Sequence, residues 1–120
     1  MKNYLIPAYI KGASLKRNHF FLGMWCHDFT KKNIFSDFEK YNTLTYHWKN
    51  KKKLIKDYKY LKNVNEKVLK SLSANLNKIH KVNNKKIYWR TILFPWLSQY
   101  TSIIYDRWEA YRLFLNRYKN

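Results

Sequence analysis

The segment FLGMWCHD, residues 21–28, gathers side chains that could support chemistry near the N-terminus. Gly23 would let a ligand or a backbone come close, and Trp25 offers an apolar face on which a sugar or a base can stack. Cys26 fits a buried core residue better than a nucleophile, because no oxyanion-binding motif accompanies it. We therefore take Gly23 and Trp25 as candidate substrate-binding residues.

Two further residues are candidates for binding a substrate. His47 lies between two aromatic residues just before a predicted helix, where an exposed imidazole could meet a ligand or cap the chain entry. Arg90 carries a guanidinium that can hold phosphate or carboxylate through paired hydrogen bonds, although an ordinary surface arginine explains it equally well. The sequence has no G-x-G-x-x-G motif and no P-loop, so it offers no self-contained nucleotide site. The catalytic residues stay unknown.

Metal binding is not expected. Cys26, His27, His47 and His80 are the nearest approach to a ligand set, but their spacing matches no zinc motif and two of them are adjacent. The single cysteine excludes an internal disulfide and is typical of a reducing compartment. The sequence shows neither a signal peptide nor a stretch apolar enough to span a bilayer, so we expect no transmembrane segment and a cytoplasmic location.

Short strands are expected to position the first candidates. Apolar runs at residues 4–10 and 19–25 predict strands near 4–9 and 20–25. The gap between them is barely long enough for the crossover that parallel pairing requires. If the strands are parallel, ligands bind beyond their carboxyl ends, where Gly23 and Trp25 would lie. Residues 26–49 predict a loop with one helical turn near 36–41.

A helical pattern begins near residue 50 and predicts helices at 51–81 and 86–117, separated by VNNKK, in which Asn83 and Asn84 tolerate a left-handed backbone. Pro95 predicts a kink in the second helix. The expected fold class is mostly α with a small β part, an α/β fragment in which two short N-terminal strands precede a long antiparallel αα-hairpin. A single domain spans 1–120, with strands and loops in 1–49 and the hairpin in 50–120. The predicted buried stripes are Leu54, Tyr58, Leu61, Val68, Leu72, Leu76 and Ile79, and Trp89, Leu93, Trp96, Tyr100, Ile103, Tyr111 and Phe114, widened by Ile92, Leu97, Ile104 and Trp108.

Polar residues interrupt both stripes. Arg107 lies in the middle of the second stripe, and a buried guanidinium is costly unless it is paired. Counted outward from the turn, Arg107 comes level with residues 57–65 of the first helix. Asp57 or Asn65 is therefore its expected partner, in a pair that fixes the register of the two helices rather than one that serves catalysis.

The net charge of +18 needs an explanation, and the balance of 20 lysines to 5 arginines gives one. Lysines fall opposite the apolar stripe of the first helix and are typical of a solvated face. The alternative is a basic helical module that binds nucleic acid or an anionic surface. Such a module displays basic and aromatic residues together, whereas the aromatic residues here are assigned to buried stripes. No specific nucleic-acid partner is therefore expected.

Seven short motifs in order carry a resemblance to a known family. The sequence resembles the N-terminal segment of a bacterial transferase family from O-antigen and other surface-polysaccharide biosynthesis loci. It departs from that pattern at Phe94, where the family tends to have glycine. The motifs are FLGMWC (21–26), YHW (46–48), KLIKDYKYL (53–61), LNKIH (76–80), YWR (88–90), PWL (95–97) and DRW (106–108).

The resemblance implies a function that the residues alone do not. Family members are several times longer, which implies that this chain is an amino-terminal piece, inactive alone and partnered by the remainder of the parent polypeptide. It implies glycosyl-type transfer to a glycan from an activated nucleotide-sugar donor, on a two-domain glycosyltransferase scaffold. It implies no cofactor within this piece and identifies no catalytic residue.

Overall fold

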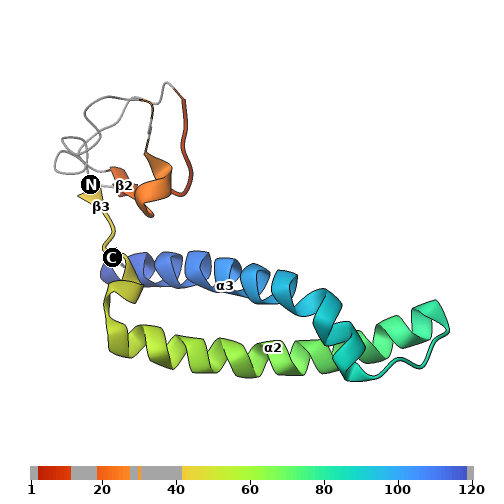
Figure 1. Ribbon diagram of the computed structural model, residues 1–120. Coiled ribbons are helices and arrows are strands. Elements are labelled where there is room, and N and C mark those ends of the chain that lie inside the picture. Colours follow the sequence, from red (N-terminus) through yellow and green to blue (C-terminus); the bar gives the residue numbers. More distant parts are fainter. Residues whose placement is uncertain (1–2, 12–18, 28–29, 31–41, 119–120) are drawn as a thin grey trace. The chain divides into compact units, whose positions relative to one another are not determined.

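The computed structural model of the chain describes residues 3–11, 19–27, 30 and 42–118 (Figure 1). Two compact units divide the chain. The sheet unit comprises residues 1–49 and 108–120, and the hairpin unit comprises residues 50–107. The fold is mostly helical, with a small three-stranded parallel sheet followed by two long packed helices. The sequence predicted the mostly helical class, two of the strands and the helical hairpin.

The sheet unit contains three parallel strands in the order β1-β2-β3, namely β1 (Tyr4–Ile6), β2 (His19–Phe21) and β3 (Asn42–Thr43). The two predicted strands are confirmed but are shorter than expected. Strand β3 lies in the segment predicted as loop. It was not predicted because its two polar residues have no strand pattern, and they form a strand only by pairing with β2. The helical turn expected near 36–41 lies outside the described residues.

The core of the sheet unit joins residues that are far apart in sequence. Ile6, Phe21, Leu22 and Cys26 pack in one buried cluster with Ala110, which belongs to the last turns of α3 (Lys86–Tyr118). The ring of Phe20 lies 5.8 Å from that of Phe114 and 4.3 Å from that of Tyr118. The C-terminal turns of α3 therefore complete the core on which the strands are built.

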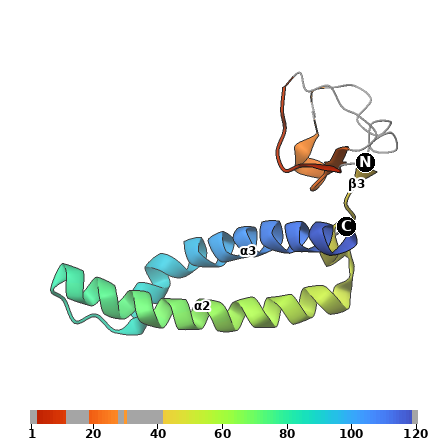
Figure 2. The same cartoon turned by 180° about the vertical axis from the view of Figure 1, so that it is seen from behind.

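The hairpin unit consists of α2 (Lys51–His80) and the first two-thirds of α3, which lie side by side in both views (Figures 1 and 2). Asn50 caps α2, because its side chain accepts the Lys53 N–H at 3.2 Å. Lys81 ends α2 with φ 54°, and the Val82 N–H donates to the Asn77 carbonyl at 3.0 Å. Helix α3 bends in the segment that contains Pro95, as proline inside a helix requires (Figure 1).

The turn between the helices is closed differently from the prediction. The left-handed residue is Lys81, not Asn83 or Asn84. Asn84 instead exchanges two hydrogen bonds with the Asn77 side chain, at 2.9 and 3.1 Å, and the same Asn77 oxygen accepts the Trp89 indole N–H at 2.8 Å. One amide thus ties the end of α2, the turn and the start of α3 together.

The face that α2 buries is not the predicted stripe. Its buried residues follow one another in steps of four and include three polar ones, Asp57, Leu61, Asn65, Leu69 and Ser73. A row of i±4 positions winds around the helix, so it leaves the straight 3.6-residue stripe after two turns. Of the predicted stripe, Leu61 is buried and Val68, Leu72 and Leu76 are half-buried, whereas Leu54, Tyr58 and Ile79 are exposed.

The same correction applies to α3 within the hairpin unit. Trp89 and Leu97 are buried as predicted, but Ile92, Trp96, Tyr100, Ile103 and Ile104 are exposed. Some polar side chains between the helices have hydrogen-bond partners, either across the hairpin or within their own helix. The Thr101 hydroxyl donates to Asn65 Oδ1 at 2.7 Å, and the Ser73 hydroxyl donates to the Leu69 carbonyl at 2.7 Å. The buried faces of the two helices could not be predicted from hydrophobicity, because they contain fewer apolar residues than the exposed faces.

Candidate functional site at the carboxyl edge of the sheet

The three strands run parallel and in register, so their carboxyl ends meet at one edge of the sheet. Each segment that leaves this edge turns quickly. A 3-10 turn, η1 (Met24–Cys26), follows β2, and a second one, η2 (His47–Lys49), follows β3. We call the strand ends and these turns the carboxyl edge. It is the edge at which open parallel sheets collect ligands.

Gly23 and Trp25 are brought together at the carboxyl edge. A Cβ atom at position 23 would lie 2.2 Å from Cζ3 of the Trp25 ring, so the indole covers the space that a side chain would need. The backbone of Gly23 is extended, with φ −175°, which any residue can adopt. Trp25 Nε1 donates to the Pro7 carbonyl at 3.3 Å. The ring therefore connects the exit of β2 with the exit of β1.

His27 is a site residue that the sequence offered only as a zinc ligand. It is buried, its ring stacks on that of Phe21 at 4.2 Å, and its Nε2 lies 2.9 Å from the Thr43 hydroxyl oxygen. This hydrogen bond connects the exit of β2 with the end of β3. Sequence reasoning could not find it, because Thr43 is 16 residues away on a strand that was not predicted.

His47 follows β3 at the same edge, but the expectation of an exposed imidazole is wrong. The residue is 8% exposed. Its ring centre lies 5.1 Å from that of Tyr46 and 5.0 Å from that of Trp48. The two aromatic neighbours that suggested an accessible site in the sequence instead lie beside a buried imidazole.

Arg90 lies in the hairpin unit and already faces a carboxylate. Its Nη1 pairs with Glu66 Oε1, and Lys86 Nζ lies 2.9 Å from the other carboxylate oxygen. Hydrogen bonds from Lys86 and Arg90 lower the pKa of Glu66 from 4.5 to about 2. The Arg90 guanidinium also lies 4.5 Å from the centre of the Phe94 ring. An incoming phosphate would compete with Glu66 for this guanidinium.

A parallel sheet with aromatic and imidazole groups at its carboxyl edge occurs in many unrelated proteins, so geometry alone does not identify the chain. Comparison with known protein families does. A family model described as LIC12162 family transferase matches residues 4–120. This chain belongs to the LIC12162 transferase family. The match covers both units, including the carboxyl edge and the hairpin. Neither the curated proteins nor the solved structures contain a match.

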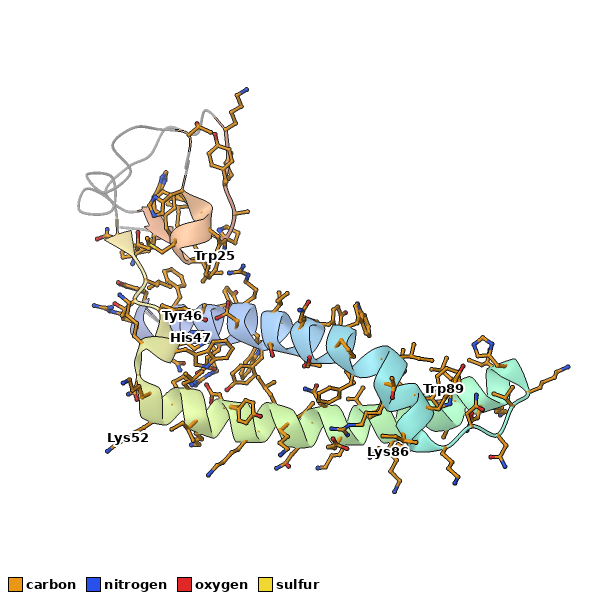
Figure 3. All side chains as sticks on the ribbon, in the orientation of Figure 1. Trp25, Tyr46, His47, Lys52, Lys86 and Trp89 are labelled. Carbon is orange, nitrogen blue, oxygen red and sulfur yellow. The ribbon has the colours of Figure 1, made fainter. Side chains whose placement is uncertain are left out.

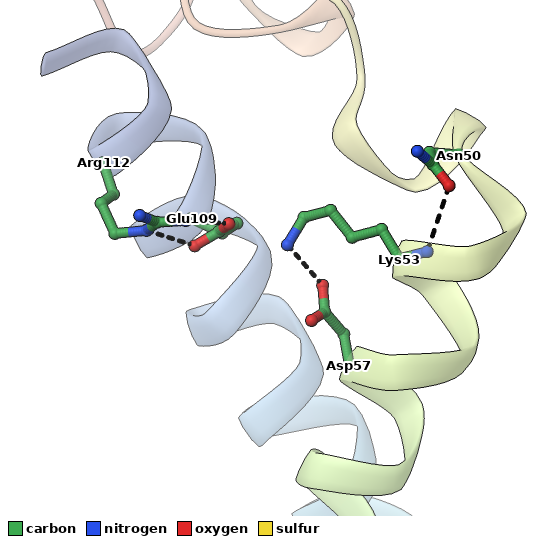
Figure 4. A network of polar contacts seen from close by, with 5 residues as sticks. All are labelled: Asn50, Lys53, Asp57, Glu109 and Arg112. Atoms are coloured by element: carbon green, nitrogen blue, oxygen red, sulfur yellow. Dashed lines mark hydrogen bonds and ion pairs between the residues drawn. The ribbon is translucent and has the colours of Figure 1, made fainter. Parts of the chain in front are cut away.

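In this LIC12162 family chain, Arg107 is not buried as expected, and its pairing with Asp57 or Asn65 stays a prediction. The Arg107 side chain is 43% exposed and its Nη1 lies 3.6 Å from Asp106 Oδ2. Asn65 accepts the Thr101 hydroxyl, and Asp57 is buried and lies 2.9 Å from Lys53 Nζ (Figure 4). The burial premise was wrong because the side of α3 that faces α2 includes the buried Leu97 and the half-buried Thr101, whereas position 107 is exposed.

A buried carboxylate that the sequence did not single out lies in the sheet unit. Glu109 is 1% exposed, and the Arg112 guanidinium holds it with two hydrogen bonds of 2.8 and 2.7 Å (Figure 4). A buried carboxylate needs such a fork, because an uncompensated buried charge is very costly. The i,i+3 spacing of the two residues was the available signal.

Neither a metal-ion cluster nor a membrane-spanning helix is found in the described part of the family chain. Among residues 3–11, 19–27, 30 and 42–118, no group of three or more His, Cys, Asp or Glu residues is arranged to hold a metal ion. Over the same residues, no helix has the length and apolar character needed to cross a membrane.

Proposed function

We propose that this chain is the N-terminal part of a glycosyl-type transferase of bacterial surface-polysaccharide or O-antigen biosynthesis. The observation that carries the proposal is the carboxyl edge, where Trp25, His27 and Thr43 lie together on a parallel sheet. Membership of a transferase family supports it. An activated nucleotide-sugar donor suits such an edge, because an indole face stacks on a sugar ring and strand ends leave backbone groups for polar contacts.

The roles proposed for the side chains follow from their geometry. Trp25 supplies the stacking face, and Gly23 leaves the space in which the indole lies. The hydrogen bond between His27 and Thr43 holds the exits of two strands in place. His47 is proposed as a supporting residue of the turn after β3, because it is buried beside the rings of Tyr46 and Trp48. Arg90 is proposed as a contact for an anionic group, in competition with Glu66. The catalytic residues, the glycan acceptor site and the cytoplasmic activity are proposed for the complete parent polypeptide, so the 120-residue chain alone is inactive.

A binding experiment on the chain itself tests the proposal. Saturation-transfer NMR with a panel of nucleotide sugars should detect contact with the sugar-ring protons in the wild type. Trp25→Ala should abolish this transfer, because the stacking face is removed. Trp96→Ala is the matched control, since Trp96 is an exposed tryptophan of the hairpin unit, and it should bind like the wild type. Transfer that survives in Trp25→Ala, or its absence for every nucleotide sugar tested, contradicts the proposal.

A second experiment in the complete parent separates a site from a core residue. Trp25→Ala and Arg90→Ala are assayed for glycan product alongside the melting temperature. Loss of product with an unchanged melting temperature supports a direct contact with the substrate. Joint loss of product and stability assigns these residues to the framework.

A specific observation also favours a second candidate, a basic module that binds nucleic acid. The aromatic residues are not confined to buried stripes. Tyr58 and Tyr60 are exposed on α2 beside Lys56, Lys59 and Lys62. Exposed tyrosines among lysines are what single-stranded nucleic acids bind. We expect only weak binding that ignores sequence and is lost with salt, because arginine is scarce. Sequence-selective binding at about 0.15 M salt, measured by fluorescence anisotropy, would favour the second candidate.

A further inference from the structure

The outer side of α3 in the hairpin unit carries apolar side chains that nothing in the hairpin covers. Tyr88, Ile92, Trp96, Tyr100 and Ile103 follow one another at helical spacing and are 48–58% exposed. We call these five residues the aromatic face. The rings of Trp96 and Tyr100 stack at 5.0 Å with an angle of 16° between their planes. A stacked tryptophan–tyrosine pair open to water is unusual for a helix that already buries its other side.

The aromatic face has the size of a small interface. Five large side chains, each with about half of its roughly 200 Å² exposed, present about 500 Å² of apolar surface. The sixteen residues from Tyr88 to Ile103 extend about 23 Å along the helix. Two such faces pressed together would bury about 1,000 Å², which lies at the lower limit of specific interfaces.

The aromatic face is also uncharged in a strongly basic protein. No Asp, Glu, Lys or Arg occurs from Thr91 to Tyr105, although the chain carries a net charge of +18. A surface for nucleic acid or anionic lipid needs cations among or beside its apolar groups. The lysines are instead exposed on α2, whose buried row faces α3, and Lys52 points away from α3 (Figure 3). The chemistry of the aromatic face therefore fits another uncharged apolar surface.

We propose that the aromatic face binds the same face of a second copy of this chain, through a two-fold axis beside Trp96. The spacing of the five residues is close to symmetric about Trp96, which is what a self-complementary interface requires. In an antiparallel α3–α3 pair, Ile92 of one copy lies opposite Tyr100 of the other, and Tyr88 lies opposite Ile103. The two lysine-rich α2 helices then occupy the outer sides of the dimer, where salt screens their repulsion over about 8 Å.

The proposal predicts an unusual salt dependence. Two copies of charge +18 repel each other, so added salt should strengthen the dimer. Binding to an anionic partner would respond in the opposite direction. An interface near the lower size limit should form in the micromolar range rather than the nanomolar range.

Sedimentation equilibrium of the full chain tests the proposal at about 0.1 M and about 0.5 M salt. The wild type should show a monomer–dimer equilibrium that is tighter at the higher salt. Trp96→Lys and Ile103→Lys should each weaken the dimer at least tenfold. Tyr58→Lys is the matched control, because it adds the same charge at an exposed aromatic of α2, and it should dimerise like the wild type. Circular dichroism of all three variants verifies that the helices persist.

Three outcomes would overturn the proposal. The first is a wild type that stays monomeric at every concentration and salt. The second is a Trp96→Lys variant that dimerises like the wild type with its helices intact. The third is binding to phosphatidylglycerol vesicles that Trp96→Ala abolishes, which would assign the aromatic face to a lipid surface.

Discussion

Replacing Gly23 by alanine should open the sheet unit, because the new Cβ and the Trp25 ring require the same space. The Cβ would lie 2.2 Å from Cζ3 and 2.3 Å from Cη2 of Trp25. Carbon atoms pack at about 3.5–4.0 Å, so the indole must move by about 1.5 Å. That shift removes the hydrogen bond from Trp25 Nε1 to the Pro7 carbonyl.

The expected magnitude combines three effects. Overpacking costs about 1–3 kcal/mol, and the lost hydrogen bond costs about 0.5–1.5 kcal/mol. Alanine restricts the unfolded chain and returns about 0.4–1 kcal/mol. The sheet unit should therefore lose about 0.5–4 kcal/mol of stability, which corresponds to a roughly 2- to 700-fold increase in its open population.

Hydrogen exchange measures this loss where it occurs. The Leu22 N–H donates to the Ile6 carbonyl and the Leu44 N–H donates to the Phe21 carbonyl, both at 3.0 Å, so these amides report opening of the sheet. Gly23→Ala should accelerate their exchange and leave the amide of Leu69, in the middle of α2, unchanged. In a Trp25→Ala background, Gly23→Ala should become nearly neutral. An equal effect of Gly23→Ala with and without the indole would refute the reasoning and assign the cost to the backbone.

Three further changes should have measurable effects. Asn77→Ala removes hydrogen bonds to Asn84 and Trp89 and should destabilise the hairpin by about 2–4 kcal/mol in urea unfolding. Leu69→Ala opens a cavity at a fully buried position and should cost about 3–5 kcal/mol in the same measurement, with a loss below 1 kcal/mol arguing against the packing. The pKa of Glu66 is about 2 in the folded chain, so the stability it contributes is present above pH 4.5 and is lost between pH 4.5 and 2; Glu66→Gln should flatten this part of a thermal pH profile.

The helices were predictable because both have a long helical pattern and a break separates them, and α2 also has a signal at its start. Asn50 precedes α2 as a capping residue, and the predicted ends at 81 and 117 differ from the observed ones by one residue each. The buried faces were not predictable from hydrophobicity. The row from Asp57 to Ser73 is polar at three of its five positions, so an apolar stripe necessarily points elsewhere.

The carboxyl edge was predictable in part. A glycine beside an aromatic residue at the end of a predicted strand singled out Gly23 and Trp25, and the structure shows the Trp25 ring lying against Gly23. Their role in substrate binding stays a prediction. The partnership of His27 with Thr43 required knowledge of a two-residue strand that has no sequence pattern. The exposed state expected of His47 failed, because neighbouring aromatic residues can cover an imidazole as easily as present it.

The makeup of the sheet unit has a consequence for synthesis on the ribosome. Its core needs Ala110, which is translated long after Ile6 and Phe21. At about 5–20 residues per second, the strand of Phe21 waits roughly 5–20 s for that helical turn. The hairpin depends mostly on contacts between successive helices, so it can form earlier. The strands that are synthesised first are thus among the last elements to be packed into a complete core. Until then, their apolar residues, such as Ile6 and Phe21, are available to chaperones.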